Sequence, residues 1–190
     1  MSSLALLMAG DFLAAAYAYK SELLNSPSDV ASIGGLSQAY CGSGKYSDAI
    51  PLLEHIVSLP VVFSGENSGQ SLQLGVAYWC TADGSRGMQI LRDLCEGVLN
   101  GHIKMVPDRA GGASFGLILH YMAFTSGSVD DREFAISYLN KLRKRYRARR
   151  APLIFPSHAV LQILGDASFE DALDGATGQR SLEGAMEVGR

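Results

Sequence analysis

The segment from Val30 to Pro60 reads VASIGGLSQAYCGSGKYSDAIPLLEHIVSLP, and this segment decides the expected fold. Ahead of Gly44, apolar residues recur at steps of three and four: Ile33, Leu36, Ala39 and Tyr40. This spacing places them on one face of a helix, and the Gly-Ser-Gly-Lys stretch at 42–45 then forms a turn into a second helix. The segment therefore predicts a hairpin of two antiparallel helices.

The same pattern occurs once before in the chain. The series Gly10-Asp11-Phe12, Ala15, Tyr19 and Pro27 recurs as Gly44-Lys45-Tyr46, Ala49, Leu53 and, one position early, Pro60. Small residues at the second helix of each unit, such as Ala15 and Ala49, are expected where two helices approach closely. Because one hairpin cannot bury its apolar face alone, repeated hairpins are expected to stack.

The pattern resembles the tetratricopeptide repeat, whose unit is a helical hairpin. In the segment from Val30 to Pro60 the matching positions are Leu36, Tyr40, Gly44, Tyr46, Ala49, Leu53 and Pro60. A third unit with a shifted phase contains Leu74, Gly75, Tyr78, Gly87, Leu91 and Leu94, and a degenerate fourth contains Phe115, Gly116, Leu119, Ala135, Leu139 and Leu142.

The resemblance implies an all-α fold, a right-handed stack of antiparallel helical hairpins that resembles a tetratricopeptide α-solenoid. The repeats would cover about residues 2–147, and residues 151–190 would form a short helical cap and tail. The whole chain, 1–190, is expected to form a single domain. The first helix is expected to be short, because Met1 lies where that helix should already have begun.

Composition bounds the class of protein. The 190 residues are 47% hydrophobic and 18% charged, against a usual charged share of about 25%. This balance predicts an ample core and excludes a disordered chain. The longest apolar run, from Phe12 to Tyr19, is far shorter than the roughly 20 residues that cross a bilayer. The apolar N-terminus lacks a basic region and carries Asp11, so we expect it to belong to the mature protein.

Motifs for catalysis, metals and cofactors are missing from the sequence. There is no G-x-S-x-G, phosphate loop or H-E-x-x-H, and the four histidines are scattered without the pairing of metal ligands on one helix face. Three cysteines, Cys41, Cys80 and Cys95, show no C-x-x-C spacing, which favours a reducing cytoplasm. We expect no catalytic residue, no metal and no cofactor, and a protein that is not an enzyme. The alternative is a cysteine nucleophile with a histidine base.

The first helices of stacked hairpins line the concave face, which is where a partner-binding groove is predicted. Residues off the core stripe of these helices are Gln38, Cys41, Val76, Trp79, Cys80, Leu117, His120, Tyr121 and Phe124. This surface is apolar and aromatic, as binding surfaces often are, but Trp79 and Tyr121 are equally expected as ordinary core. None of the nine is basic or Asn, unlike the groove residues of family members that clamp chaperone tails, so we expect no such clamp.

Charge is distributed unevenly along the chain. Residues 1–140 hold 13 acidic and 7 basic residues, whereas a short basic run holds Lys141, Arg143, Lys144, Arg145, Arg147, Arg149 and Arg150 with no acid. Cations are favourable at the C-terminus of the helix that begins near Asp131, but seven exceed what one helix end needs. The run is therefore expected to stabilise that helix or to contact an acidic partner. Nucleic acid is not the expected partner, because the rest of the chain is acidic.

We expect a non-enzymatic protein that recognises another protein. Small, acidic, cytoplasmic proteins with degenerate repeats resemble bacterial immunity proteins, which bind and block a cognate toxin domain. An acidic body suits a basic toxin. The alternatives are a chaperone like those of type III secretion, which would cradle a segment of a secreted protein, and a general scaffold or assembly adaptor. No membrane partner is expected, and the sequence makes no prediction of oligomeric state.

Overall fold

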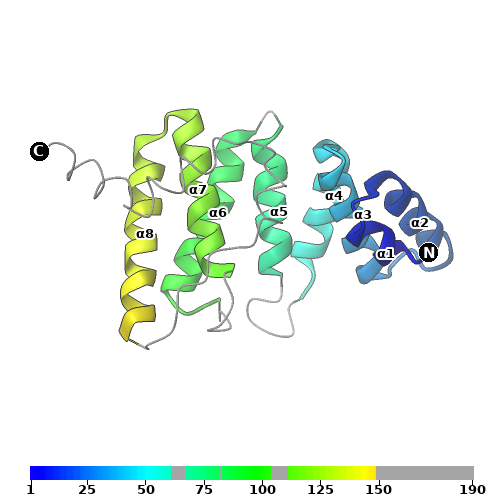
Figure 1. Ribbon diagram of the computed structural model, residues 1–190, viewed down its shortest axis with the longest axis horizontal. Coiled ribbons are helices and arrows are strands. Elements are labelled where there is room, and N and C mark those ends of the chain that lie inside the picture. The colour runs from blue at the N-terminus through cyan, green and yellow to red at the C-terminus, as the bar shows by residue number, and fades with distance from the viewer. Residues whose placement is uncertain (61–66, 82, 104–110, 149–190) are drawn as a thin grey trace, which may run out of the picture. The chain divides into compact units, whose positions relative to one another are not determined.

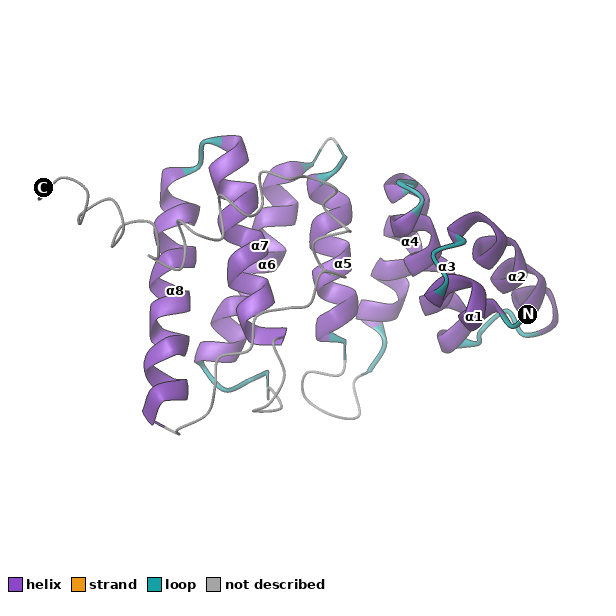
Figure 2. Cartoon of the chain, viewed as in Figure 1, coloured by secondary structure: helices purple, strands orange, loops and turns teal. Residues whose placement is uncertain are grey.

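The computed structural model describes residues 1–60, 67–81, 83–103 and 111–148. All regular structure in these residues is helical, which confirms the all-α class (Figure 2). The helices are α1 (Ser3–Met8), α2 (Phe12–Asn25), α3 (Val30–Gly42), α4 (Tyr46–Ser58), α5 (Ser68–Trp79), α6 (Gly84–Leu99), α7 (Gly111–Ser126) and α8 (Val129–Ala148). The cap and tail expected at 151–190 lie outside the described residues.

The chain divides into two compact units, Met1–Ile90 and Leu91–Arg190. The division falls inside α6, so the first part of this helix belongs to one unit and the last part to the other. Within the described residues, no helix combines the length and the apolar character that a membrane crossing requires.

In the first unit, each helix from α1 to α5 packs against the next one in the chain (Figure 1). The helix α3 also packs against α1 and α5, so that the first helices of three consecutive hairpins are neighbours. The core between them is built from small and aromatic residues: Ala15, Ala16, Tyr19, Leu36, Ala39, Tyr40, Cys41, Ala49, Leu53, Leu74, Ala77 and Tyr78. The expected short first helix is present, because α1 has 6 residues.

The repeated glycines end their helices in the same way. Gly10 and Gly44 have φ of 79° and 73°, a backbone region that glycine enters without steric cost. At each of them the amide N–H bonds a carbonyl three residues earlier, and the next N–H bonds one five residues earlier. For Gly44 these distances are 3.0 Å to Cys41 O and, from Lys45, 2.8 Å to Tyr40 O. This is a Schellman cap, which explains why glycine recurs at this point of the repeat.

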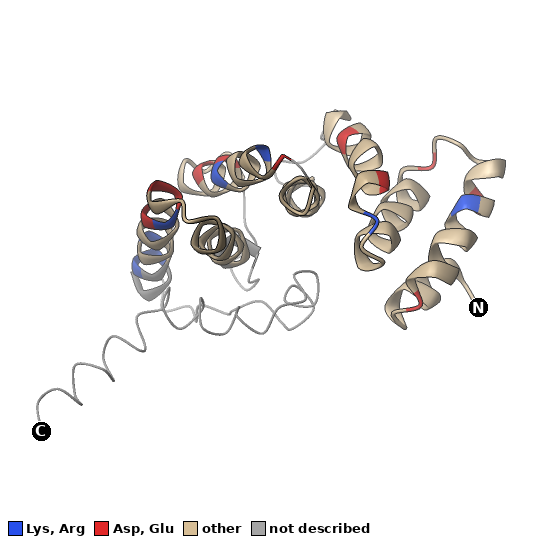
Figure 3. Cartoon of the chain, turned by 90° about the horizontal axis from the view of Figure 1, so that it is seen from above, with Lys and Arg blue, Asp and Glu red and all other residues tan. Residues whose placement is uncertain are grey.

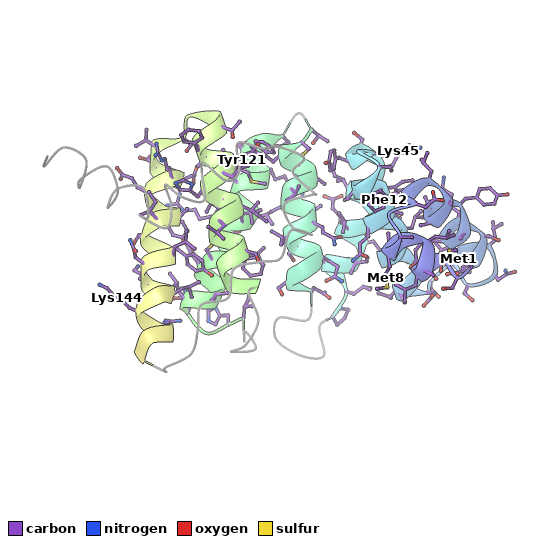
Figure 4. The ribbon with its side chains drawn as sticks, in the orientation of Figure 1. Met1, Met8, Phe12, Lys45, Tyr121 and Lys144 are labelled. Carbon is purple, nitrogen blue, oxygen red and sulfur yellow. The ribbon has the colours of Figure 1, made fainter. Side chains whose placement is uncertain are left out.

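Close contacts between hairpins also depend on glycine. A Cβ on Gly35 of α3 would collide with the ring of Tyr19 on α2, and one on Gly42 would lie 2.5 Å from the ring of Phe12 (Figure 4). Both glycines therefore allow large side chains of the first hairpin to reach the backbone of the second. The packing of α2 on α3 follows from this size complementarity.

In the second unit, α7 and α8 form an antiparallel pair joined at Gly127 and Ser128. Gly116 brings α7 close to α8, since a Cβ there would lie 2.5 Å from the Tyr138 ring. The core residues come from three helices: Leu91, Leu94, Cys95 and Val98 of α6, Phe115, Leu117, Ile118, Leu119, Tyr121, Met122 and Ala123 of α7, and Ala135, Tyr138, Leu139 and Leu142 of α8.

Candidate functional site

Three of the predicted groove residues of the first unit have side chains that a partner could reach. Gln38 of α3 is exposed, Trp79 is half-buried at the end of α5, and Cys80 is exposed where it caps that helix. Gln38 points away from the core because its neighbours Ser37 and Ala39 lie on the buried stripe of α3. Gln38 lies on α3, and Trp79 and Cys80 lie at the end of α5, which packs against α3.

Two other predicted groove residues of this unit belong to its interior. Cys41 is 7% exposed and Val76 is 2% exposed. Cys41 joins the core cluster between α3, α4 and α5, and Val76 lies one turn before the end of α5. Their burial means that they offer no surface to a partner.

The predicted groove residues of the second unit are also mostly buried. Leu117, His120 and Tyr121 are 1 to 3% exposed, and only Phe124 is half exposed, at 50%. The reason is that every residue of α7 from Ser114 to Ala123 is buried. A helix of such uniformly apolar sequence has no free face for a groove. Tyr121, labelled in Figure 4, is therefore a core residue, which is one of the two positions expected for it.

His120 is an unusual member of this buried helix. It is 1% exposed, and neither ring nitrogen has a hydrogen-bond partner within the described residues. Burial lowers the pKa of His120, and the positive charge of Arg132 lowers it further. The imidazole is therefore held neutral, and no hydrogen bond from the described part of the chain compensates the desolvation of its two nitrogens.

The thiols are poorly suited to nucleophilic catalysis. Burial raises the pKa of Cys41 to about 12 and raises the pKa of Cys95 and Cys80 as well. A hydrogen bond with Tyr46 opposes the shift at Cys80 without cancelling it. Since the thiolate is the reactive form, a raised pKa leaves little of each cysteine in the nucleophilic thiolate form at neutral pH. Within the described residues, no group of three or more His, Cys, Asp or Glu side chains could hold a metal ion.

A polar cluster that sequence reasoning missed ties three helices of the first unit together. Tyr78 of α5 donates a hydrogen bond of 2.5 Å to Glu54 of α4, and Arg86 of α6 donates one of 3.0 Å to the same carboxylate oxygen. The Arg86 guanidinium also lies 4.2 Å from the centre of the Tyr78 ring. Burial and the Glu54 carboxylate raise the pKa of Tyr78. The only sequence signal was a tyrosine at a repeat position, because Tyr78 and Arg86 lie 24 and 32 residues from Glu54 in the chain.

The basic run has a structural role at one position. Arg145 donates hydrogen bonds to the carbonyl oxygens of Val98, at 3.3 Å, and Leu99, at 2.7 Å, in the last turn of α6, where carbonyl groups lack partners within the helix. Lys141 and Lys144 are exposed, and Lys144 projects from α8 away from α7 (Figure 4). The side chains of Arg143 and Arg147 and the whole of 149–150 lie outside the described residues.

The acidic start of α8 completes this arrangement. Asp130 and Asp131 lie in its first turn, and the basic residues follow along the same helix (Figure 3). Acids at the N-terminus and cations at the C-terminus complement the helix dipole. The structural interpretation of the basic run is thus supported for Arg145, whereas Lys141 and Lys144 remain available to a partner.

No protein-family model matches this chain, and no significant match was found among the curated proteins or among the solved structures. A proposal about function therefore starts from the residues described above.

Proposed function

We propose that the chain is a non-enzymatic protein-recognition module built as a right-handed, tetratricopeptide-like stack of helical hairpins. Two features support this arrangement within the first unit. The first helices α1, α3 and α5 are neighbours, and the same glycine cap ends α1 and α3. Stacked hairpins of this kind present their first helices as a continuous surface for another protein.

The binding surface that we propose is formed by α3 and α5, with Gln38, Trp79 and Cys80 as its reachable side chains. The observation that carries this proposal is that Gln38 and Cys80 are exposed and Trp79 is half-buried on two helices that pack against each other. A tryptophan fixed at its base and open at one edge is the kind of side chain that contributes most to protein interfaces.

For the partner we propose a folded, basic toxin domain that the protein binds and neutralises in the cytoplasm. The first unit, residues 1–90, carries 7 acidic and 3 basic residues. One of the three bases, Arg86, is already paired with Glu54. Several of the acids are exposed, among them Asp11, Glu22 and Asp48. A negative potential of this kind speeds association with a basic partner and selects against acidic ones.

A second candidate is a chaperone of a secreted protein, with a general adaptor as the broader form of the same idea. The observation that favours it is the low charge of the proposed surface, because an extended apolar segment would bind Trp79 and Cys80 without needing acidic residues. The two candidates differ in their expected salt dependence. Binding of a basic toxin should weaken as salt is added, whereas binding of an apolar segment should not.

The experiment that separates them is capture by the immobilised protein, with elution along a salt gradient and identification of what is retained. The key variants are Trp79→Ala, Gln38→Arg and Gln38→Glu. Trp79→Ala keeps the Cβ atom that lies against Gly87 and removes the indole ring, whose Cδ1 atom lies on the side of Gly84. Gln38 is exposed, so its two variants change local charge without disturbing the packing. Helicity and melting temperature are measured for every variant.

A toxin inhibitor should retain one folded basic domain whose activity the protein blocks. Gln38→Arg should then weaken binding and Gln38→Glu should preserve or strengthen it, and Trp79→Ala should weaken it about tenfold or more. Retention of an unfolded segment that is insensitive to the charge at position 38 would support the chaperone instead. Retention that none of the three variants alters would overturn the proposed surface.

A further inference from the structure

The outer face of α2 carries large apolar side chains that the first unit leaves uncovered. Leu13, Tyr17 and Leu24 are 63%, 79% and 84% exposed. The core residues Ala15 and Tyr19 lie on the other side of the same helix, at 0% and 6%. Of the described helices of its unit, α2 packs against α1 and α3, and neither covers this outer face (Figure 1).

The exposed residues, together with Lys20, have the spacing of a coiled-coil seam, the name used for positions 13, 17, 20 and 24 below. Positions 13, 17, 20 and 24 are separated by four, three and four residues, which is the alternation of core positions in a heptad. At about 100° per residue they fall within roughly 60° of one another on the helix surface. The flanking Ala14 and Ser21 are small and uncharged, so a second helix could approach closely. The seam itself contains one charge, Lys20.

The seam is also symmetric about its centre, between Ala18 and Tyr19. In an antiparallel pair of identical helices, Leu13 would face the partner's Leu24, and Tyr17 would face the partner's Lys20. Such a pairing places two leucines together at each end and a lysine stem against an aromatic ring in the middle. A parallel pairing would instead place the two lysines against each other, which like charges oppose.

We propose that this face of α2 docks a second copy of the same chain in an antiparallel, isologous dimer. The seam of one copy is complementary to the same seam of a second copy, as a two-fold interface between identical chains requires. Its three large side chains expose on the order of 400 Å² per copy. That is about half of the roughly 800 Å² that each partner of a stable complex usually contributes. The dimer is accordingly weak and depends on concentration. It uses no residue of the α3 and α5 surface, so it is independent of the proposed function.

The test is sedimentation equilibrium of the full chain from roughly 5 to 500 µM, a range that brackets a weak dimer. The variants are Leu13→Glu, Leu24→Lys and the double variant. The control is Val129→Glu, because Val129 is 65% exposed, close to the value of Leu13, but lies in the other unit. All of these substitutions fall on exposed side chains, and circular dichroism checks that each variant is folded.

The wild type and the control should pass from the mass of one chain toward that of two as concentration rises. Each single variant should raise the dissociation constant at least tenfold. In the double variant, the glutamate introduced at position 13 would face the lysine introduced at position 24 of the other copy. That variant should therefore regain part of the lost affinity at low salt and lose it again at high salt.

Two results would count against the dimer. A wild type that stays monomeric at all concentrations, or single variants that dimerise as the wild type does, would overturn the proposal. A double variant as weak as the single variants would overturn its antiparallel geometry.

Discussion

Arg92 of α6 donates a hydrogen bond of 2.7 Å to Asp131 of α8, and the two residues are 39 positions apart in the chain. The same guanidinium lies 4.3 Å from the centre of the Phe134 ring. The Asp131 carboxylate also accepts a hydrogen bond from Ser128, at the start of α8. One aspartate therefore binds the serine at the start of its own helix and joins that helix to α6 within the second unit.

We predict that Arg92→Ala and Asp131→Asn each destabilise the second unit by about 1 kcal/mol. The side chains are 32% and 20% exposed, so solvent screens their attraction only in part. Urea denaturation of both variants and of the double variant measures their coupling, expected at about 0.5 to 1 kcal/mol. Strictly additive effects would show that the two side chains act independently.

Gly87 of α6 is the point of closest approach to α5. A Cβ added there would lie 2.5 Å from Gly75 O and 2.7 Å from Trp79 N, and neither backbone atom can move without shifting α5. We predict that Gly87→Ala lowers the melting temperature and costs about 1 to 3 kcal/mol. Gly69→Ala is the matched control, because Gly69 lies in α5 with nothing within 4 Å of the added Cβ. The control should stabilise α5 by up to about 1 kcal/mol.

The helical hairpins could be predicted because their signals are local. Gly10 and Gly44 end helices through bonds that span only five residues, and Gly87 was identified by its place in the repeat as a point of close approach. The spacing of apolar residues within 30–60 likewise depends on one helix at a time. These features follow from the backbone and need no knowledge of distant partners.

The groove was harder to predict because it depends on what covers each helix. The stretch FGLILHYMAF in α7 is apolar on every side, and this signal favours a buried helix over one with an open face. The repeat positions nevertheless suggested that Leu117, His120 and Tyr121 were open. Contacts such as that of Glu54 with Arg86 could not be predicted from the sequence either, since they join residues from different helices.

His120 should make the stability of the fold depend on pH. Its folded pKa is lowered, whereas in the unfolded chain it titrates near 6.5, so the unfolded state binds more protons as pH falls below about 6.5. Protonation of His120 in the unfolded chain therefore lowers the free energy of unfolding below about pH 6.5, and this contribution is absent at higher pH. We predict that His120→Leu raises stability by about 1 kcal/mol at pH 7 and by more at lower pH, because it also removes two unpaired buried nitrogens.

Thermal unfolding between about pH 5 and pH 8 measures this difference. The control is His55→Gln, at an exposed position, which should keep the pH dependence of the wild type. A constant difference between His120→Leu and the wild type at every pH would show that His120 does not titrate differently in the folded chain.

The three thiols should differ in their reaction with an aromatic disulfide reagent. Cys80 is exposed, whereas Cys41 is buried with a pKa raised to about 12 and Cys95 is 0% exposed. We predict that one thiol per native chain reacts promptly, and that the other two react only at the rate of unfolding. The prompt reaction should accelerate as the pH rises above about 8, because the pKa of Cys80 is also raised. Cys80→Ser should abolish the prompt phase, and a second prompt thiol in that variant would contradict the burial of Cys41 and Cys95.

Arg145 and Lys144 are adjacent in the basic run, and their substitution distinguishes its structural role from a role in binding. Arg145 donates to two carbonyl groups at the end of α6, and the Val98 oxygen also accepts a hydrogen bond from the Gly101 N–H. We predict that Arg145→Ala costs about 1 to 2 kcal/mol and increases hydrogen exchange at the end of α6, because charged donors make the stronger hydrogen bonds. Lys144→Ala should change stability by less than about 0.5 kcal/mol, since Lys144 is exposed. If Lys144→Ala weakens capture of a partner while stability is unchanged, the exposed lysines of α8 take part in binding. If both variants are equally stable, the bonds from Arg145 do not hold α6 and α8 together.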